Sequence, residues 1–271
     1  MDLRHIAILV ILICTPVSLA EDDLATYWYA KGQESLNNSS YEKAIDSFDR
    51  SIAEDRDNWD AWYGKGKALI GIENFDDGLA LCDEVLGNPY GPQGERLAQF
   101  LALDGYFNKA YEDKYGKPTM TNPETGASSN DMPERYQLAM ERYDEALNLD
   151  PNMTSAWNGK GIAFGDAGQF DESIKCFDRA LSIDRTLAEV FNNKGVSLDR
   201  QRKNDESLAC YDRAIELNPE LAQAWMNRAR TLSLNLSLFS MAQQNASRAV
   251  ELDPSLENET SLMTWNYIQL F

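Results

Sequence analysis

A unit of 34 residues recurs along the chain and constrains its fold more than any other feature. Five similar segments open on an aromatic residue, at Trp28, Trp62, Trp157, Phe191 and Trp225. The spacing is 34 residues from Trp28 to Trp62, and again from Trp157 to Phe191 and from Phe191 to Trp225. A period of this length is typical of chains built from stacked supersecondary units, each of which buries its apolar face against its neighbours.

Each recurring segment predicts a pair of helices. The aromatic residue lies in the first helix, as in WNGKGIAFG from Trp157. After a short turn comes a second segment with apolar residues at helical spacing, as in FDESIKCFDRALSID from Phe170. The sequence therefore predicts helix, turn, helix, turn in every unit.

The order of residues within a unit identifies a family resemblance. One unit contains Trp157, Gly161, Ser173, Phe177 and Ala180, and the next contains Phe191, Gly195, Ser207, Tyr211, Ala214 and Pro219. This succession of aromatic, glycine, small residue, aromatic and alanine resembles the tetratricopeptide repeat. The resemblance implies an all-α fold, an α-solenoid in which stacked antiparallel helix hairpins form a right-handed superhelix.

The glycines of WNGKGIAFG raise a second interpretation, a phosphate-binding loop. Their spacing, G-x-G-x-x-x-G, fits neither the dinucleotide fingerprint nor the P-loop, and no strand-like run precedes them. Gly161 is better explained by packing, because a residue without a side chain lets the two helices of a hairpin approach. Glycine inside a helix costs up to about 1 kcal/mol, which close packing can offset.

The pattern divides the chain into six units that resemble the tetratricopeptide repeat (TPR). These TPR-like units are expected at 25–58, 59–92, 98–153, 154–187, 188–221 and 222–255. The third is longer, and we expect a long first helix, a second helix and an inserted loop at about 117–133, rich in Pro, Gly, Ser, Thr and Asn. A loop of this length is either mobile or functional. The sixth unit carries one extra residue, and a capping helix is expected over 256–271 to cover the last apolar face.

Residues 1–20 have the features of a signal peptide. A weakly positive start precedes the apolar run from Ile6 to Cys14, and Ser18-Leu19-Ala20 supplies small residues for cleavage. We expect export, with the mature chain secreted or held in the cell envelope. An uncleaved anchor is the alternative, and it would also place the remainder outside the cytoplasm.

Export has consequences for chemistry. The only histidine of the chain, His5, would leave with the signal, which removes His-dependent nucleophile activation and His-containing metal sites. Three cysteines would remain, Cys82, Cys176 and Cys210, and we interpret them as buried residues rather than a disulfide framework. Asn-x-Ser/Thr sequons suggest a glycoprotein and occur at Asn37, Asn38, Asn152, Asn235, Asn245 and Asn258.

Charge and motifs narrow the function classes. A formal charge of −19 and the absence of a basic run argue against nucleic acid as a partner. No D-x-D-x-D-G calcium loop occurs, and nothing converges on a nucleophile, so we expect no metal, no cofactor and no enzyme activity. The remaining hypothesis is an interaction protein.

The resemblance implies a concave groove that holds another protein or a peptide, lined by the first helices of the units. The groove candidates are Tyr29, Gln33, Tyr63, Lys67, Asn158, Asn192, Asn193, Asn227 and Arg230. Amides at this spacing can bond a peptide backbone, and the cations can pair with carboxylates. An alternative is a carbohydrate or small-ligand site that uses Tyr29, Trp59 and Tyr63 as stacking platforms and the inserted loop as a lid.

A basic residue also recurs just before the packing glycine or alanine, at Lys31, Lys65, Lys160, Lys194 and Arg228. Such a stripe could bind a ligand. Repeated salt bridges between helices explain it without a partner, and we prefer that interpretation.

Overall fold

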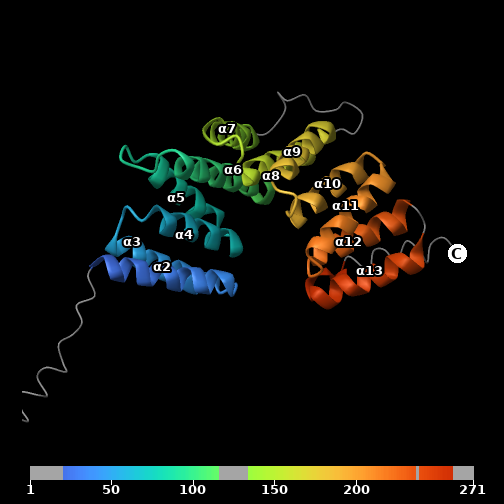
Figure 1. Cartoon of the computed structure of the whole chain (residues 1–271), viewed down its shortest axis with the longest axis horizontal. Coiled ribbons are helices and arrows are strands. Elements are labelled where there is room, and N and C mark those ends of the chain that lie inside the picture. The colour runs from blue at the N-terminus through green and yellow to red at the C-terminus, as the bar shows by residue number, and fades with distance from the viewer. Residues whose placement is uncertain (1–20, 116–133, 236–237, 259–271) are drawn as a thin grey trace, which may run out of the picture. The chain divides into compact units, whose positions relative to one another are not determined.

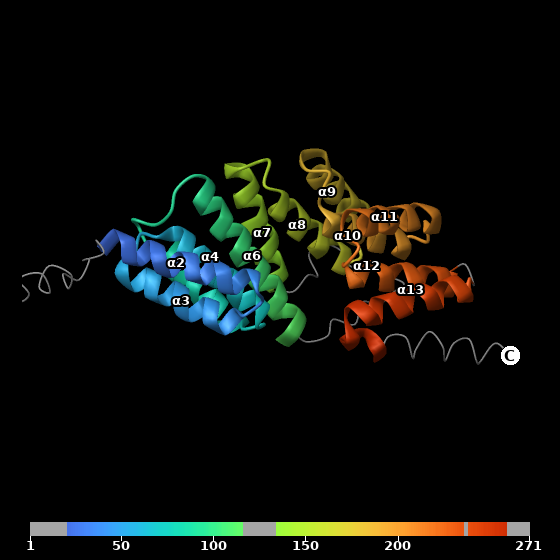
Figure 2. The same ribbon diagram turned by 60° about the horizontal axis from the view of Figure 1, so that its bottom comes forward.

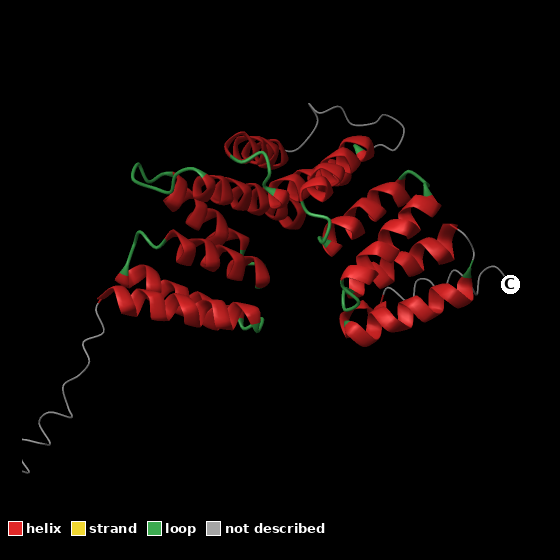
Figure 3. Ribbon diagram, in the orientation of Figure 1, coloured by secondary structure: helices red, strands yellow, loops and turns green. Residues whose placement is uncertain are grey.

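The computed structural model describes residues 21–115, 134–235 and 238–258, and every regular element among them is helical (Figure 3). The predicted signal peptide, the inserted loop and most of the predicted capping helix lie outside these ranges. The chain forms two compact units, Met1–Pro92 and Gln93–Phe271. We call these two bodies the first and second units and describe each by itself; a sixth, preceding or following unit always means one of the six TPR-like units of the sequence.

The first unit consists of two helical hairpins. Its helices are α2 (Glu21–Asn37), α3 (Tyr41–Glu54), α4 (Trp59–Gly71) and α5 (Phe75–Leu86). Helix α2 packs on α3, and α4 packs on both α3 and α5 (Figure 1). The side chains of Asn58 and Asn74 cap α4 and α5, because each accepts a hydrogen bond from a backbone N–H of the first turn.

The second unit continues the same pattern. Its helices are α6 (Glu95–Tyr115), α7 (Glu134–Leu149), α8 (Thr154–Asp166), α9 (Phe170–Ile183), α10 (Ala188–Arg200), α11 (Asn204–Leu217), α12 (Ala222–Arg230) and α13 (Phe239–Leu252). Figure 2 shows α10 beside α11 and α12 beside α13, and α9 also contacts α10. The all-α repeat architecture expected from the sequence is confirmed.

Buried aromatic rings fill the space that glycines leave between hairpins. The ring of Phe48 is fully buried, and a Cβ added to either Gly32 or Gly64 would lie 2.5 Å from it. The ring is thus held between its own hairpin and the next one. Similar contacts join Tyr143 to Gly105 and Gly159, Phe177 to Gly161, and Tyr211 to Gly195. Gly161 is therefore a packing glycine, because any side chain there would collide with Phe177.

Four of the five recurring basic residues pair with the preceding hairpin. Lys65 Nζ lies 2.7 Å from Asp49, Lys194 Nζ 2.6 Å from Asp178, and Arg228 Nε 2.7 Å from Asp212. Lys160 pairs in the same way with Asp144. The two partners are 16 residues apart in every case, which links the first helix of one unit to the second helix of the unit before. These four ion pairs are the salt bridges between helices that were expected of the basic stripe, whereas Lys31 pairs with Glu34 of its own helix at 2.7 Å.

Three tryptophans tie their helices to the preceding turn. The indole Nε1 of Trp62, Trp157 and Trp225 donates to the carbonyl oxygen six residues earlier, at 3.0 Å in each case. The carbonyls belong to Arg56, Pro151 and Pro219. The aromatic residue that opens a unit therefore also fixes the turn between units.

A π-helical turn takes up the extra residue of the sixth unit. Helix α12 is followed directly by the π-helix η2 (Thr231–Asn235). A π turn contains one residue more than an α turn, and single π turns are the usual form in which helices absorb an insertion. Thr231 is fully buried there, and its Oγ1 donates to Asp199 of α10 at 3.0 Å.

A buried polar cluster lies where the long helix α6 packs on α7. Asp104 is 4% exposed and accepts hydrogen bonds from Arg142 Nε at 2.8 Å and from Asn108 Nδ2 at 3.0 Å. Lys109 is 9% exposed and lies 2.7 Å from Asp166 of α8. Each buried charge is paired, as burial in an apolar interior requires. This cluster could not be recognised in the sequence, because its members follow no repeat period.

Candidate functional site

A row of side-chain amides crosses three consecutive first helices of the second unit. Asn193 Nδ2 on α10 donates to Asn158 Oδ1 on α8 at 3.1 Å, and Asn227 Nδ2 on α12 donates to Asn192 Oδ1 on α10 at 2.9 Å. Arg230 closes the row by donating to Asn227 Oδ1 at 3.3 Å. Asn192 Nδ2 donates to Asn193 Oδ1 at 3.4 Å and joins these bonds, so all five groove candidates of this unit lie in one connected set, which we call the amide row.

The members of the amide row differ in exposure. Asn192 and Asn227 are only 6% and 5% exposed, whereas Asn158 and Asn193 are half-buried. The expectation that all of them face a ligand is corrected for the first two, since their polar atoms are turned to neighbouring amides. A buried amide that is bonded in this way keeps the helices in register and fixes the rotamer of its exposed neighbour.

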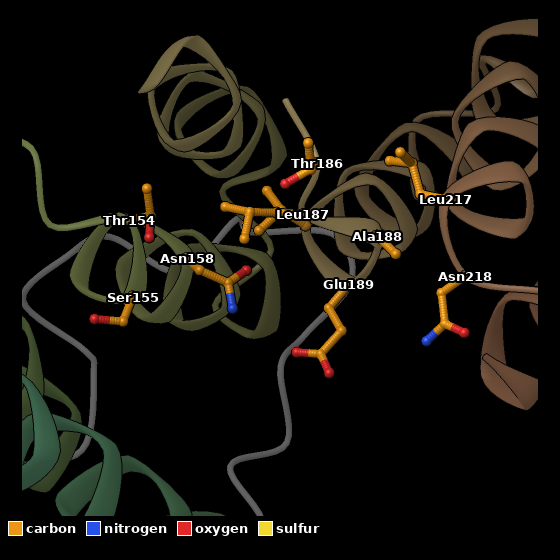
Figure 4. Close-up of a pocket in the computed structure, with 10 residues that line it drawn as sticks. Thr154, Ser155, Asn158, Thr186, Leu187, Ala188, Glu189, Leu217 and Asn218 are labelled. Atoms are coloured by element: carbon orange, nitrogen blue, oxygen red, sulfur yellow. The ribbon is translucent and has the colours of Figure 1, made fainter. Parts of the chain in front are cut away.

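A pocket of about 590 Å³ adjoins the row at Asn158 (Figure 4). It lies between the N-terminal ends of α8 and α10 and the C-terminal end of α11. Its lining residues are Thr154, Ser155, Asn158, Thr186, Leu187, Ala188, Glu189, Val190, Leu217 and Asn218. Leucine, valine and alanine side chains form the apolar part, and hydroxyl, amide and carboxylate groups form the rest. Such a mixture suits a peptide side chain with its backbone alongside.

Two polar groups of this pocket have bonding capacity to spare. Asn158 Oδ1 accepts from Asn193, while Asn158 Nδ2 donates no hydrogen bond within the described part of the chain. Glu189 is exposed and makes no ion pair with any residue that the structure describes. In Figure 4 the carboxamide of Asn158 and the carboxylate of Glu189 both face the space between α8 and α10. The pocket thus offers a donor and an anionic acceptor to a ligand.

The candidates of the first unit form a separate set on α2 and α4. Lys67 Nζ lies over the ring of Tyr63, 5.1 Å from its centroid, and burial raises the pKa of the Tyr63 hydroxyl. The ring of Tyr29 lies 6.1 Å from that of Phe48, and Gln33 is half-buried near it on α2. Trp59 stacks on Trp62 at 6.5 Å between ring centroids. These contacts occupy part of the ring surface that a stacked sugar would need.

Most of the pocket residues could not be recognised in the sequence. Leu187 and Asn218 belong to turns, and Glu189 lies in the first turn of a helix, outside the positions that define the repeat. One feature of the sequence could have indicated Glu189. It carries a charge at a position where the preceding unit has Ser155 and the following unit has Gln223. These pocket residues come together only when the successive helix hairpins stack on one another.

Comparison with known families assigns the architecture. Tetratricopeptide repeat models match residues 29–92, 154–187 and 188–221. Together with the paired helices and the glycine–aromatic contacts, these matches show that the chain belongs to the tetratricopeptide repeat family. Proteins of this family generally mediate protein–protein interactions and are generally not enzymes.

Individual relatives are distant. The peroxisomal targeting signal receptors of Komagataella phaffii and Komagataella pastoris are each 26% identical over an alignment 149 residues long, which covers 48% of this chain and 25% of the receptor. The chain thus matches about a quarter of the length of these relatives.

Solved structures with the same fold include TTC0263 of Thermus thermophilus, with a TM-score of 0.64 and 15% identity, covering 78% of this chain and 100% of the other. The Pseudomonas aeruginosa protein pilF has a TM-score of 0.56 and 17% identity, covering 93% and 99%. The Cut9 and Hcn1 complex of the APC/C gives a TM-score of 0.67 and 15% identity, covering 91% and 45%. At these identities the likeness concerns the fold alone.

Proposed function

We propose that the protein is a non-catalytic scaffold that binds an extended segment of another protein along the amide row of its second unit. The observation that carries this proposal is the spare donor of Asn158, which opens into a pocket with an apolar floor. An extended segment carries backbone carbonyls that need donors and side chains that need apolar space.

The groups of the pocket define the chemistry of the bound segment. Asn158 Nδ2 donates to a backbone carbonyl, and an apolar side chain enters beside Leu187 and Val190. Glu189 then pairs with a cation or a backbone N–H of the same segment. Arg230, at the far end of the row, is placed to attract a carboxylate.

The similarity to peroxisomal targeting signal receptors supports a peptide segment as the ligand class, because those proteins are named as receptors for a targeting signal. This support is limited to the 149-residue alignment. It concerns the mode of binding, and the partner itself is proposed only by its chemistry.

We further propose that the protein works outside the cytoplasm, as residues 1–20 indicate. In the described ranges, no helix is both long and apolar enough to cross a bilayer. If the protein is glycosylated, the exposed sequons are the suitable sites; they are Asn37, Asn38, Asn152 and Asn258. Asn245 is unsuitable, since it is 7% exposed and its Nδ2 donates to the Met241 carbonyl at 2.7 Å.

Site-specific photocrosslinking in the cells that produce the protein tests the proposal. A benzophenone amino acid at the exposed pocket position Ser155 is expected to capture a protein segment, which peptide mass spectrometry then identifies. The same group at Lys175, an exposed residue outside the pocket, serves as the control.

Substitutions complete the experiment. Asn158→Ala combined with Glu189→Gln is expected to lower the yield of the Ser155 crosslink, while Gln243→Ala, an exposed amide on α13, leaves it unchanged. The proposal fails if the crosslinked species contains no protein segment, or if the double substitution leaves the yield at the wild-type level.

A further inference from the structure

A second groove lies in the first unit, on the side formed by its second helices. It has a volume of about 500 Å³ and runs between α3 and α5, with α4 as its floor. Trp62, Leu69 and Leu81 are buried in the floor, at 7%, 2% and 4% exposure, and the half-buried Ile45 and Ile72 extend it. The residues of α4 proposed for the concave groove, Tyr63 and Lys67, are not among its lining residues.

Carboxylates border this apolar floor on both sides. Glu42 and Asp49 lie on α3, and Asp77 and Glu84 lie on α5. The two members of each pair are seven residues apart, which places them on one face of the helix about 10.5 Å apart along its axis. The groove therefore has an apolar centre and an acidic group near each corner.

The four carboxylates are not all neutralised within the protein. Lys65 pairs with Asp49 at 2.7 Å, and Arg56 pairs with Glu84 at 3.0 Å. Arg56 and Glu84 are 77% and 54% exposed, so this pair is weak and can exchange. Glu42 and Asp77 make no ion pair with the residues that the structure describes, although Asp77 accepts a hydrogen bond from Asn74 at 2.8 Å.

The equivalent groove of the second unit shows that only one side of the acidic border recurs. Asp205 and Asp212 on α11 correspond to Glu42 and Asp49, whereas Met241 and Arg248 on α13 stand at the positions of Asp77 and Glu84. The groove between α11 and α13 has a similar floor, with Trp225 and the ion pair of Arg228 with Asp212. Its lining contains no acidic residue besides Asp212 among those described, and Met241, Gln244 and Asn245 occupy the α13 side. The same backbone geometry thus carries a different surface chemistry in the two units.

We propose that the groove between α3 and α5 binds a cationic amphipathic helix of another protein. The apolar stripe of that helix packs on the half-buried Ile45 and Ile72, which keep accessible apolar surface in the groove. Lysine or arginine residues on each side of the stripe, seven positions apart, pair with the carboxylates of α3 and α5. Glu42 and Asp77 supply the main attraction, because the other two carboxylates already have internal cations.

Binding of a synthetic helix to the full-length protein tests this proposal. The probe is a fluorescein-labelled peptide with a leucine stripe flanked on both sides by lysines spaced seven residues apart. Titration by fluorescence anisotropy is expected to give saturable binding that weakens between about 0.15 M and about 0.5 M salt, since part of the attraction is screened. A scrambled peptide of the same composition, which lacks the stripe, is expected to bind more weakly.

Matched variants locate the site. Glu42→Gln combined with Asp77→Asn is expected to raise the Kd about fivefold, as the loss of two exposed ion pairs predicts. Asp205→Asn combined with Glu206→Gln makes the same change of charge at exposed positions of α11 and should leave the Kd unchanged. Ala80→Arg, which places a long cation inside the groove at an exposed position, should abolish binding while circular dichroism confirms the fold.

Three results would overturn the proposal. These are no saturable binding to the wild-type protein, an equal loss of affinity in the α11 control variant, and full affinity in Ala80→Arg. Each can be assigned to binding rather than folding, because all the substituted positions are exposed.

Discussion

The ring of Tyr143 on α7 occupies the space in front of Gly159 on α8, where an added Cβ would lie 2.5 Å from the ring Cζ. We therefore expect Gly159→Ala to destabilise the protein by about 1–3 kcal/mol through overpacking. Gly165→Ala is the milder comparison, since its nearest neighbour would be Ser173 Oγ at 3.2 Å. Urea unfolding curves measure both, and equal stability of Gly159→Ala and wild type would contradict the packing described above.

The hydroxyl of Tyr143 is buried without a hydrogen-bond partner among the described residues, and burial raises its pKa. Tyr143→Phe removes this unsatisfied group, so we expect it to leave stability unchanged or to raise it by up to about 1–3 kcal/mol. Tyr136→Phe is the opposite case. The Tyr136 hydroxyl donates to Asp113, and its loss should cost about 1.5–3 kcal/mol. Thermal unfolding measures both variants. The melting temperature of Tyr136→Phe should fall below that of the wild type, and that of Tyr143→Phe should stay the same or rise.

Truncation of Trp62 should be more damaging than truncation of Trp157. Trp62 is 7% exposed, and we expect Trp62→Ala to cost about 3–5 kcal/mol in the free energy of unfolding. Trp157 packs only partly buried against the cluster of Phe177 and Val190, so its replacement removes less contact area. Trp62→Phe separates the indole hydrogen bond from the packing and should cost less than Trp62→Ala. The reverse order of the two alanine variants would show that the two sites do not have the burial described.

The Cys176 thiol should resist alkylation at neutral pH. Burial disfavours the thiolate and raises its pKa to about 11, so the reactive form is scarce until the pH approaches that value. We expect the iodoacetamide labelling rate of Cys176 in the folded protein to rise with pH well beyond about pH 8.5, the ordinary midpoint of a free thiol. Peptide mass spectrometry follows the rate at each pH, with urea-unfolded protein as the reactive control. A labelling midpoint near the ordinary value would show an accessible thiol.

Export predicts a processed N-terminus. We expect the mature protein to begin at Glu21, which is also the first residue of α2. Intact-mass measurement of protein recovered outside the cytoplasm would detect the loss of residues 1–20. Ala20→Arg blocks the cleavage site and should leave the full-length chain. Recovery of the unprocessed wild-type chain from the cytoplasm would contradict both the cleavage and the proposed location.

The fold could be predicted because its main contacts repeat in the sequence. Gly161 and Phe177 are recognisable as a packing pair, since the same combination recurs as Gly195 with Tyr211. The ion pair of Lys194 with Asp178 follows from the same periodicity, because the basic stripe implied partners on a neighbouring helix. Features that repeat every 34 residues can be recognised in the sequence without the structure.

The candidate site was less predictable because its contacts join residues that are polar and far apart. Polarity alone suggested that Asn192 and Asn227 are exposed. They are buried with a hydrogen bond from Asn227 Nδ2 to Asn192 Oδ1 across the stacked hairpins, and neighbouring side chains bond their remaining polar atoms. Leu187 lies in the turn before α10 and Glu189 in the first turn of that helix, and the repeat pattern does not constrain the side chain at either position.

The π-helix Thr231–Asn235 has a consequence for how such chains can change in length. One inserted residue within a continuous α-helix rotates everything after it by about 100° and would turn an apolar face towards water. Here the π turn lies at the end of its own helix, before the separate helix α13, and Ala242, Ala246 and Ala249 of α13 face inwards at 3%, 6% and 0% exposure. A hairpin can therefore gain a residue at this point while the helices that follow keep their buried faces, and an array of such hairpins can vary in length there.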